Sequence, residues 1–205
     1  MNSMQPEGNY FDKYAANGLI INAIMKGYFT QLDRMLNSIA YENVYEAGCG
    51  EGHISQHVYN YNLVRQRNVH VTASDVSETV ISKAKVDFPH IRFKVKSIYD
   101  LDEDDSSYEL VIACEVLEHI DNPTKALKEL FRISKRYVYI SVPNEPIWRI
   151  ANFMRGKYIR YMGNTPGHIN HWTKREIMRL IDNYGNILKV ATPFPWTMIL
   201  SEKKQ

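Results

Sequence analysis

The segment Val44–Gly52, which reads VYEAGCGEG, holds the residues whose types and spacing best suit ligand chemistry. A β-branched and an aromatic residue lead into an acid, Glu46, and three glycines follow at alternate positions: Gly48, Gly50 and Gly52. Glycine has no Cβ, so the backbone can turn sharply and a ligand can approach closely. An apolar strand before such a turn and a helical pattern after it place a nucleotide-like ligand at the carboxyl end of the strand.

The glycine spacing also discriminates between ligands. A dinucleotide site has the pattern G-x-G-x-x-G, which would require the third glycine where His53 stands. This chain has E-x-G-x-G-x-G instead, and Glu46 would repel a pyrophosphate but attract a ligand that carries an ammonium group. A nicotinamide-dependent dehydrogenase is therefore the weaker alternative, and no Tyr-x-x-x-Lys constellation for hydride transfer can be placed.

Two further segments follow in the order that a nucleotide-binding βαβ unit requires. Residues 69–75 read as a strand that ends in Asp75, an acid that can accept hydrogen bonds from both ribose hydroxyls. Residues 110–119, LVIACEVLEH, read as a buried apolar strand that runs into a polar segment.

With these segments, the chain resembles the class I S-adenosylmethionine-dependent methyltransferases, in particular the small-molecule methyltransferases. The matching segments are Glu46–Gly52, Ala73–Ser77, Cys114–His119 and Tyr137–Pro143, and the likeness covers roughly residues 40–200. The resemblance implies S-adenosylmethionine as cofactor and S-adenosylhomocysteine as product. It implies cofactor contacts from Glu46, Ala47, Gly48, Cys49, Gly50, Gly52, Asp75, Val76, Ser97, Ile98, Cys114 and Glu115, with Ser97 and Ile98 at the adenine edge.

Alternating strand and helix patterns predict an α/β fold with a doubly wound sheet. Strands are expected near 43–47, 69–74, 91–95, 109–114, 137–142, 186–192 and 196–202, and helices near 10–40, 52–66, 77–87, 123–134 and 173–184. The resemblance implies a seven-stranded, Rossmann-like methyltransferase sheet that is mostly parallel and ends in an antiparallel C-terminal hairpin. We expect residues 1–40 to form a helical cap or lid and residues 41–205 to form the methyltransferase domain.

Composition limits the setting and the partners. The 205 residues suit one compact core, and a net charge of +2 gives no reason to expect nucleic acid. The chain has no apolar run of about 18 residues, so no membrane span is expected. Its first ten residues are polar and do not resemble a signal peptide, which predicts a cytoplasmic protein. We expect a monomer or homodimer. Cys49 and Cys114 suit small buried positions, with a redox pair as the alternative if their strands are neighbours.

His119 has two interpretations. It follows Glu118 near a helix start, where a histidine commonly bonds the backbone, but its ordinary pKa near 6.5 also suits a general base for an acceptor hydroxyl or amine. His168 and His171 form a second pair, yet Pro166 and Gly167 disfavour the helix that would place both on one face. No third metal ligand is near them in sequence, so no metal site is expected.

The substrate signal lies in residues 146–175, which contain no acid, several Lys and Arg residues, and many aromatics. In the family that the chain resembles, this segment lies over the substrate cleft. A basic, aromatic cover would suit an anionic or ring-bearing small molecule, while a solvated amphipathic helix and a membrane-surface helix are the alternatives. Candidate substrate contacts are Tyr10, Tyr14, Arg149, His168, His171 and Trp172. The expected reaction is methyl transfer to an oxygen or nitrogen of that molecule; a catalytically inactive binding subunit is the non-enzymatic alternative.

Overall fold

The computed structural model describes residues 19–145, 147 and 167–204 of the chain. Seven strands form one sheet in the order β3-β2-β1-β4-β5-β7-β6. The strands are β1 (Asn43–Ala47), β2 (His70–Asp75), β3 (Arg92–Val95), β4 (Tyr108–Cys114), β5 (Ser134–Pro143), β6 (Gly185–Ala191) and β7 (Trp196–Lys203). The helices are α1 (Leu19–Leu36), α2 (His53–Val64), α3 (Glu78–Asp87), the single-turn η1 (Leu117–His119), α4 (Pro123–Ile133) and α6 (Lys174–Asp182).

The strand order confirms the doubly wound sheet with its antiparallel end. β3, β2, β1, β4 and β5 are parallel neighbours, whereas β7 runs antiparallel to both β5 and β6. The chain leaves β1 toward β2 and β3, then returns to place β4 on the other side of β1. Ligands of such sheets bind at the carboxyl ends of the strands where the order reverses. That point lies here between β1 and β4.

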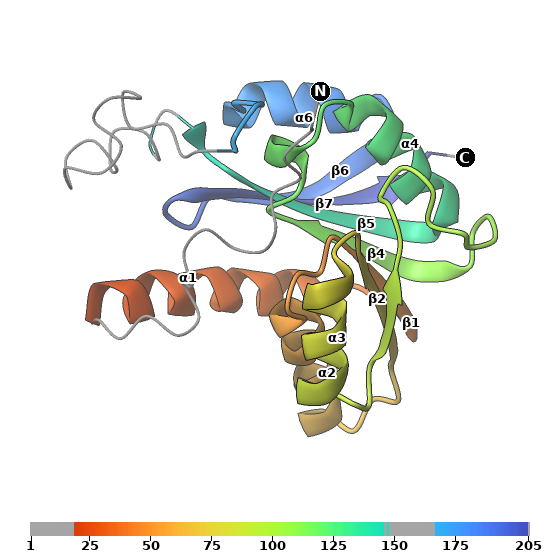
Figure 1. Ribbon diagram of the computed structural model, residues 1–205. Coiled ribbons are helices and arrows are strands. Elements are labelled where there is room, and N and C mark those ends of the chain that lie inside the picture. The colour runs from red at the N-terminus through yellow and green to blue at the C-terminus, as the bar shows by residue number, and fades with distance from the viewer. Residues whose placement is uncertain (1–18, 146, 148–166, 205) are drawn as a thin grey trace.

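Helices cover both faces of the sheet, as Figure 1 shows: α1, α2 and α3 lie on one face, and α4 and α6 lie on the other. Each face has its own apolar core. Leu32 of α1, Val58 of α2 and Ile81 of α3 are buried in the first core. Leu130 of α4 and Ile177 of α6 are buried in the second. Among the described residues, no helix is both long and apolar enough to cross a bilayer.

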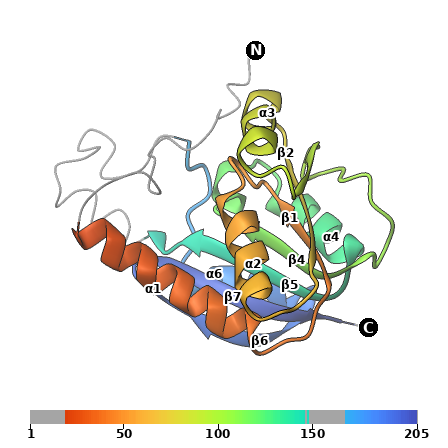
Figure 2. The same ribbon diagram turned by 90° about the horizontal axis from the view of Figure 1, so that it is seen from below.

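α1 packs directly on the sheet. Its buried residues fall at helical spacing toward its carboxyl end, while Ile20 near its start is 76% exposed. The hydroxyl of Tyr28 lies 2.9 Å from Ser141 Oγ of β5, and its ring meets Trp196 of β7 edge to face at 4.9 Å. Figure 2 shows α1 beside α2, where His57 contacts Asp33 at 2.7 Å. Residues 19–36 of the expected cap are thus part of the domain core; lid closure by residues 1–18, which lie outside the described residues, stays a prediction.

The local signals in the sequence account for most element ends. Ser77 caps α3 by accepting a hydrogen bond from Val80 N, and Thr173 and Glu176 form a capping box at α6. The clearest boundary difference is β5, which begins at Ser134 and not near 137. The strand starts early because Ser134 pairs with Tyr108 across a register shift in β4.

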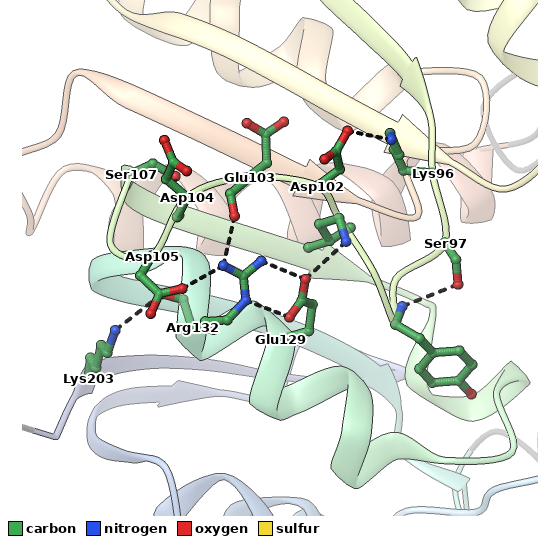
Figure 3. Close-up of polar contacts among 12 residues, drawn as sticks. Lys96, Ser97, Asp102, Glu103, Asp104, Asp105, Ser107, Glu129, Arg132 and Lys203 are labelled. Atoms are coloured by element: carbon green, nitrogen blue, oxygen red, sulfur yellow. Dashed lines mark hydrogen bonds and ion pairs between the residues drawn. The ribbon is translucent and has the colours of Figure 1, made fainter.

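The acidic loop between β3 and β4 is tied down by cations. Figure 3 shows Arg132 of α4 at its centre: the guanidinium donates to both Glu129 oxygens at 2.7 Å, to Asp105 at 2.6 Å and to the Glu103 carbonyl at 2.7 Å. Glu129 in turn accepts from Leu101 N at 3.0 Å. This network fixes the loop that follows Ser97 and Ile98, so Asp105 and Glu129 have a structural role.

Candidate active site

The glycine loop after β1 is fastened to the end of β2. Gly48 N and Cys49 N both donate to the Ser74 carbonyl, at 2.7 and 2.9 Å. Gly50 N donates to Asp75 Oδ2 at 2.9 Å, and the other Asp75 oxygen accepts from Ser77 N at 3.0 Å. The loop and the acid that the sequence predicts to bind one ligand are therefore in direct contact.

Two of the glycines are required for different reasons. Gly48 has φ +73°, and a Cβ placed there would lie 2.4 Å from Val116 Cγ2, so the loop packs tightly against the segment after β4. Gly50 has φ +52°, yet a Cβ there would meet no atom within 4 Å. Gly50 thus borders open space at the carboxyl end of β1, where the strand order places a ligand.

Glu46 is buried at the end of β1, 2% exposed. Ser55 of α2 donates a short hydrogen bond to its carboxylate. Burial raises the pKa of Glu46 to about 8, with the negative charge of Asp75 adding to the effect and the Ser55 bond opposing it. At neutral pH a carboxyl group with such a pKa is mostly protonated, and a nearby cationic group would favour loss of that proton.

The remaining predicted cofactor residues lie on the same edge of the sheet. Val76 follows β2 and is 50% exposed. Ser97 follows β3, and the Ile98 side chain is buried in the second core. An adenine contact by Ile98 would therefore involve its backbone.

Cys49 and Cys114 are free and buried. Cys49 lies in the loop after β1 and Cys114 is the last residue of β4, the strand that pairs with β1. Burial, aided by the charge of Glu46, raises the pKa of both thiols. A raised thiol pKa suppresses the thiolate and so disfavours redox or nucleophilic roles. Glu115 follows directly, has φ +57°, and its N–H donates to the Ser141 carbonyl at 3.0 Å.

A second group of polar side chains lies one turn further on. A carboxylate oxygen of Glu118, a ring nitrogen of His119 and a ring nitrogen of His168 all lie within 4.8 Å of one another. Glu118 is fully buried and His168 is 9% exposed. The rings of His119 and His168 meet edge to face with centroids 4.8 Å apart. We call Glu118, His119 and His168 the histidine cluster.

Each histidine of the cluster has an acceptor at Nδ1. His119 Nδ1 lies 3.0 Å from the Gly167 carbonyl, and His168 Nδ1 lies 2.7 Å from Glu145 Oε1. Glu145 is itself 2% exposed, and its other oxygen lies 3.5 Å from His171 Nδ1. These acceptors fix the proton on Nδ1, so Nε2 is the basic nitrogen of both rings.

The segment that carries His168 is anchored on η1. Ile169 N and Asn170 N donate to the Glu118 carbonyl at 2.9 and 3.1 Å. The Asn170 side chain donates to the Leu117 and Ile120 carbonyls at 2.9 and 2.6 Å. Two stretches far apart in sequence are thereby held in one fixed arrangement.

The sequence indicates His119, His168 and His171 as candidates, but it does not show that His119 and His168 lie together. It gives no sign of a role for Glu118, Glu145 or Asn170. The expectation of no metal site rested on the lack of a third ligand near His168 and His171 in sequence. The structure brings Glu118 and His119 beside His168, because residues 167–171 bond to η1 although β5 separates the two stretches in sequence. Trp172 lies beside them, its carbonyl accepting from Glu145 N at 3.2 Å. Tyr10, Tyr14 and Arg149 lie outside the described residues.

Comparison with known proteins decides the family. A family model described as a methyltransferase domain matches residues 23–186, most of the chain. The chain belongs to the class I S-adenosylmethionine-dependent methyltransferases. This membership decides against the nicotinamide-dependent dehydrogenase.

Two curated relatives of the chain are informative. A probable S-adenosylmethionine-dependent methyltransferase of Mycolicibacterium smegmatis is 26% identical over 154 residues, 74% of this chain and 54% of that protein. The ubiquinone biosynthesis O-methyltransferase of Coxiella burnetii is 24% identical over 163 residues, 70% of this chain and 66% of that protein. The chain therefore spans between about half and two thirds of the length of these relatives.

Solved structures share the methyltransferase fold. A Pyrococcus horikoshii protein superposes with a TM-score of 0.70 at 16% identity, covering 95% of both chains. The magnesium protoporphyrin IX methyltransferase of Synechocystis PCC 6803, solved with bound S-adenosylhomocysteine, gives a TM-score of 0.67 at 16% identity, covering 95% of this chain and 94% of that one. Identities this low show the fold alone.

The described residues suit S-adenosylmethionine, the cofactor of the family. The open space beside Gly50 leaves room for the ligand, and Asp75 lies where ribose hydroxyls would be bound. The buried Glu46 matches a ligand that carries an ammonium group.

Proposed function

We propose that the chain transfers a methyl group from S-adenosylmethionine to an oxygen or nitrogen of a small molecule. The observation that carries the proposal is the contact of the glycine loop with Asp75 beside the open space at Gly50. The same loop packs at Gly48 against Val116, the residue before η1, which carries Glu118 and His119. The sulfonium of the cofactor already makes methyl transfer favourable. The protein therefore has to hold the cofactor, align the acceptor and help it lose a proton.

The cofactor contacts are assigned as follows. Asp75 accepts hydrogen bonds from the ribose, the backbone of residues 48–50 lies against the cofactor, and Glu46 faces its ammonium group. Ser97 and Ile98 border the adenine. Val76, Glu115 and the buried Ala47, Cys49, Gly52 and Cys114 shape the site from the ends of β1, β2 and β4.

The acceptor is assigned to the side of the histidine cluster. Val116 packs against the glycine loop at Gly48, and η1 with Glu118 and His119 begins at the next residue. An acceptor bound here would be near the reacting methyl. A hydroxyl acceptor must lose its proton, and two routes are chemically open: His119 Nε2 takes the proton itself, or a Lewis acid held by the cluster acidifies the hydroxyl.

The substrate class is an anionic or ring-bearing small molecule. The acid-free, aromatic composition of residues 146–175 supports it, although most of that segment lies outside the described residues. The names of two similar proteins also support this class. One relative is a ubiquinone biosynthesis O-methyltransferase, and one structural neighbour is a magnesium protoporphyrin IX methyltransferase. Tyr10, Tyr14, Arg149, His171 and Trp172 are the proposed acceptor contacts. A cytoplasmic monomer or homodimer is the proposed setting, supported by the two free, buried cysteines.

A screen for methyl acceptors tests the proposal. The protein is incubated with methyl-labelled S-adenosylmethionine and a panel of phenols, carboxylates and amines, and label transfer is measured. Wild-type protein should label at least one class, and the Asp75→Ala variant should label it much less at low cofactor concentration. Binding of the cofactor with no transfer to any class would favour the alternative, a methyltransferase-fold binding subunit.

A further inference from the structure

The histidine cluster has the composition of a metal centre. It combines two imidazoles with one carboxylate, a donor set that first-row divalent ions accept while keeping positions open for a substrate. The three donor atoms already lie within 4.8 Å of one another. Metal–ligand bonds of about 2.0–2.2 Å would draw the three atoms closer through side-chain rotations. We propose that Glu118, His119 and His168 bind a divalent transition-metal ion.

The hydrogen bonds behind the ligands support this assignment. Histidines that ligate a metal usually donate their other N–H to a carboxylate or a backbone carbonyl, which fixes the tautomer and orients the ring. His168 has the first arrangement, with Glu145 at 2.7 Å, and His119 has the second, with the Gly167 carbonyl at 3.0 Å. Both rings therefore offer Nε2, the nitrogen that can bind an ion.

Charge and rigidity point the same way. Glu118 and Glu145 are both buried carboxyl groups, 0% and 2% exposed, and a bound dication would provide the charge partner that a buried carboxylate needs. The hydrogen bonds from Ile169 and Asn170 to η1 hold the ligands from both stretches in place. A site held in this way loses little entropy when an ion binds.

The position suggests what the ion does, and this step rests on the proposed function. The cluster follows β4 next to Val116, which packs on the cofactor loop. An acceptor hydroxyl that coordinates the ion would become more acidic, because a bound divalent metal lowers the pKa of an oxygen ligand toward neutrality, as it does for bound water. Its proton leaves to water, and the oxygen then bonds the methyl carbon as the carbon–sulfur bond breaks and the electron pair stays on sulfur. The substrate class is thereby narrowed to oxygen acceptors.

The test measures metal binding without any methyl transfer. Full-length protein, stripped with a chelator, is titrated with Co²⁺ while the visible absorption of protein-bound Co²⁺ is recorded, and Zn²⁺ is then added in competition. Wild-type protein should bind about one ion, and His119→Ala and His168→Ala should each weaken binding by at least about tenfold. Mg²⁺, which prefers oxygen ligands, should compete poorly.

Matched variants separate ligation from folding. His90→Ala removes a histidine that contacts Gln56 outside the cluster and should leave Co²⁺ binding unchanged. Glu145→Gln keeps an oxygen that can accept from His168 Nδ1 and should cost less affinity than Glu145→Ala, which should lose about 10–100-fold. Circular dichroism and S-adenosylhomocysteine binding check that each variant is folded, and His119, being only half-buried, gives the variant least prone to misfold.

Two results would overturn the metal site: wild-type protein that binds no Co²⁺, or stoichiometric binding that persists in the His119→Ala/His168→Ala double variant. The first would leave His119 as a base. Because the readout needs no methyl transfer, Co²⁺ binding by a protein that does not bind S-adenosylhomocysteine would instead count against the proposed function alone.

Discussion

The amide of Gly50 donates a hydrogen bond to the carboxylate of Asp75 at 2.9 Å, joining the turn after β1 to the end of β2. The bond leaves Asp75 with acceptor capacity, because a carboxylate can accept about four hydrogen bonds. It also places the Gly50 backbone against the same ligand that the acid would bind. The pair thus couples the shape of the loop to recognition of the cofactor.

The glycines of the loop should respond differently to substitution. Gly48→Ala should destabilise the fold, because its Cβ would collide with Val116 and its φ is positive. The Cβ of Gly50→Ala would meet no protein atom, so the variant should lose only about 1–2 kcal/mol of folding stability through left-handed backbone strain. The same Cβ would enter the open space of the ligand and weaken cofactor binding. Thermal denaturation and calorimetric titration with S-adenosylhomocysteine measure the two effects. Equal cofactor affinity in wild type and Gly50→Ala would mean that the ligand lies elsewhere.

Cofactor affinity should depend on pH through Glu46. Burial raises the pKa of Glu46 to about 8, and a ligand ammonium would favour the carboxylate, so binding below pH 8 must release a proton. Affinity should rise by up to about tenfold per pH unit up to this value and then level off. The same raised pKa means that the ligand-free fold loses stability as pH rises from 4.5 to 8.

Glu46→Gln provides the control, because an amide oxygen can still accept the Ser55 hydrogen bond but does not titrate. Calorimetry in two buffers of different ionisation enthalpy should detect proton release in the wild type and none in the variant. A pH-independent affinity in the wild type would place Glu46 away from the cofactor charge.

Arg132 should stabilise the fold through the loop after β3. Arg132→Met removes the fork to Glu129 and should cost roughly 1–2 kcal/mol by urea denaturation at neutral pH. Arg136→Met, which removes an exposed pair with Glu202, should cost less. The guanidinium holds the pKa of Glu129 below its usual value, so this stabilisation is present above pH 4.5 and is lost as pH falls through the lowered pKa. The gap between wild type and Arg132→Met should therefore narrow in acid; a constant gap would contradict the electrostatic explanation.

His119→Ala should lower kcat for an oxygen acceptor by about 10²–10⁴-fold, because both routes of proton loss need its Nε2. Cofactor affinity should hardly change, since the ring contacts Gly167 and His168 rather than the glycine loop. Steady-state kinetics with His90→Ala as the control measure this. A drop below tenfold would mean that alignment alone carries the reaction and that His119 is a structural residue.

The parts of the site that the sequence predicts are those encoded locally. The turn at Gly48–Gly52, the acid at Asp75 and the capping box at Thr173 each depend on residues a few positions apart, so spacing alone indicates them. The seven-stranded, mostly parallel sheet with its antiparallel end follows from the resemblance to a known family, and the strand pairing confirms it.

The histidine cluster could not be predicted in the same way. His119 and His168 come together only because residues 167–171 bond to η1 across the end of the sheet. Glu145 gives no signal until the fold places it behind His168. The sequence pattern likewise does not show that Glu46 is buried, which raises its pKa, or that Ser55 of α2 bonds to it and opposes this rise.

Titration of S-adenosylhomocysteine into wild type and Asp75→Ala tests the central claim most directly. Wild type should bind at micromolar concentration, and the variant should lose about 1–3 kcal/mol of binding free energy, the range for a charged hydrogen-bonding partner. Asp75→Asn, which keeps an acceptor for Gly50 N, controls for collapse of the loop. Equal binding by wild type and Asp75→Ala, or tighter binding of NAD than of S-adenosylhomocysteine by the wild type, would contradict the account.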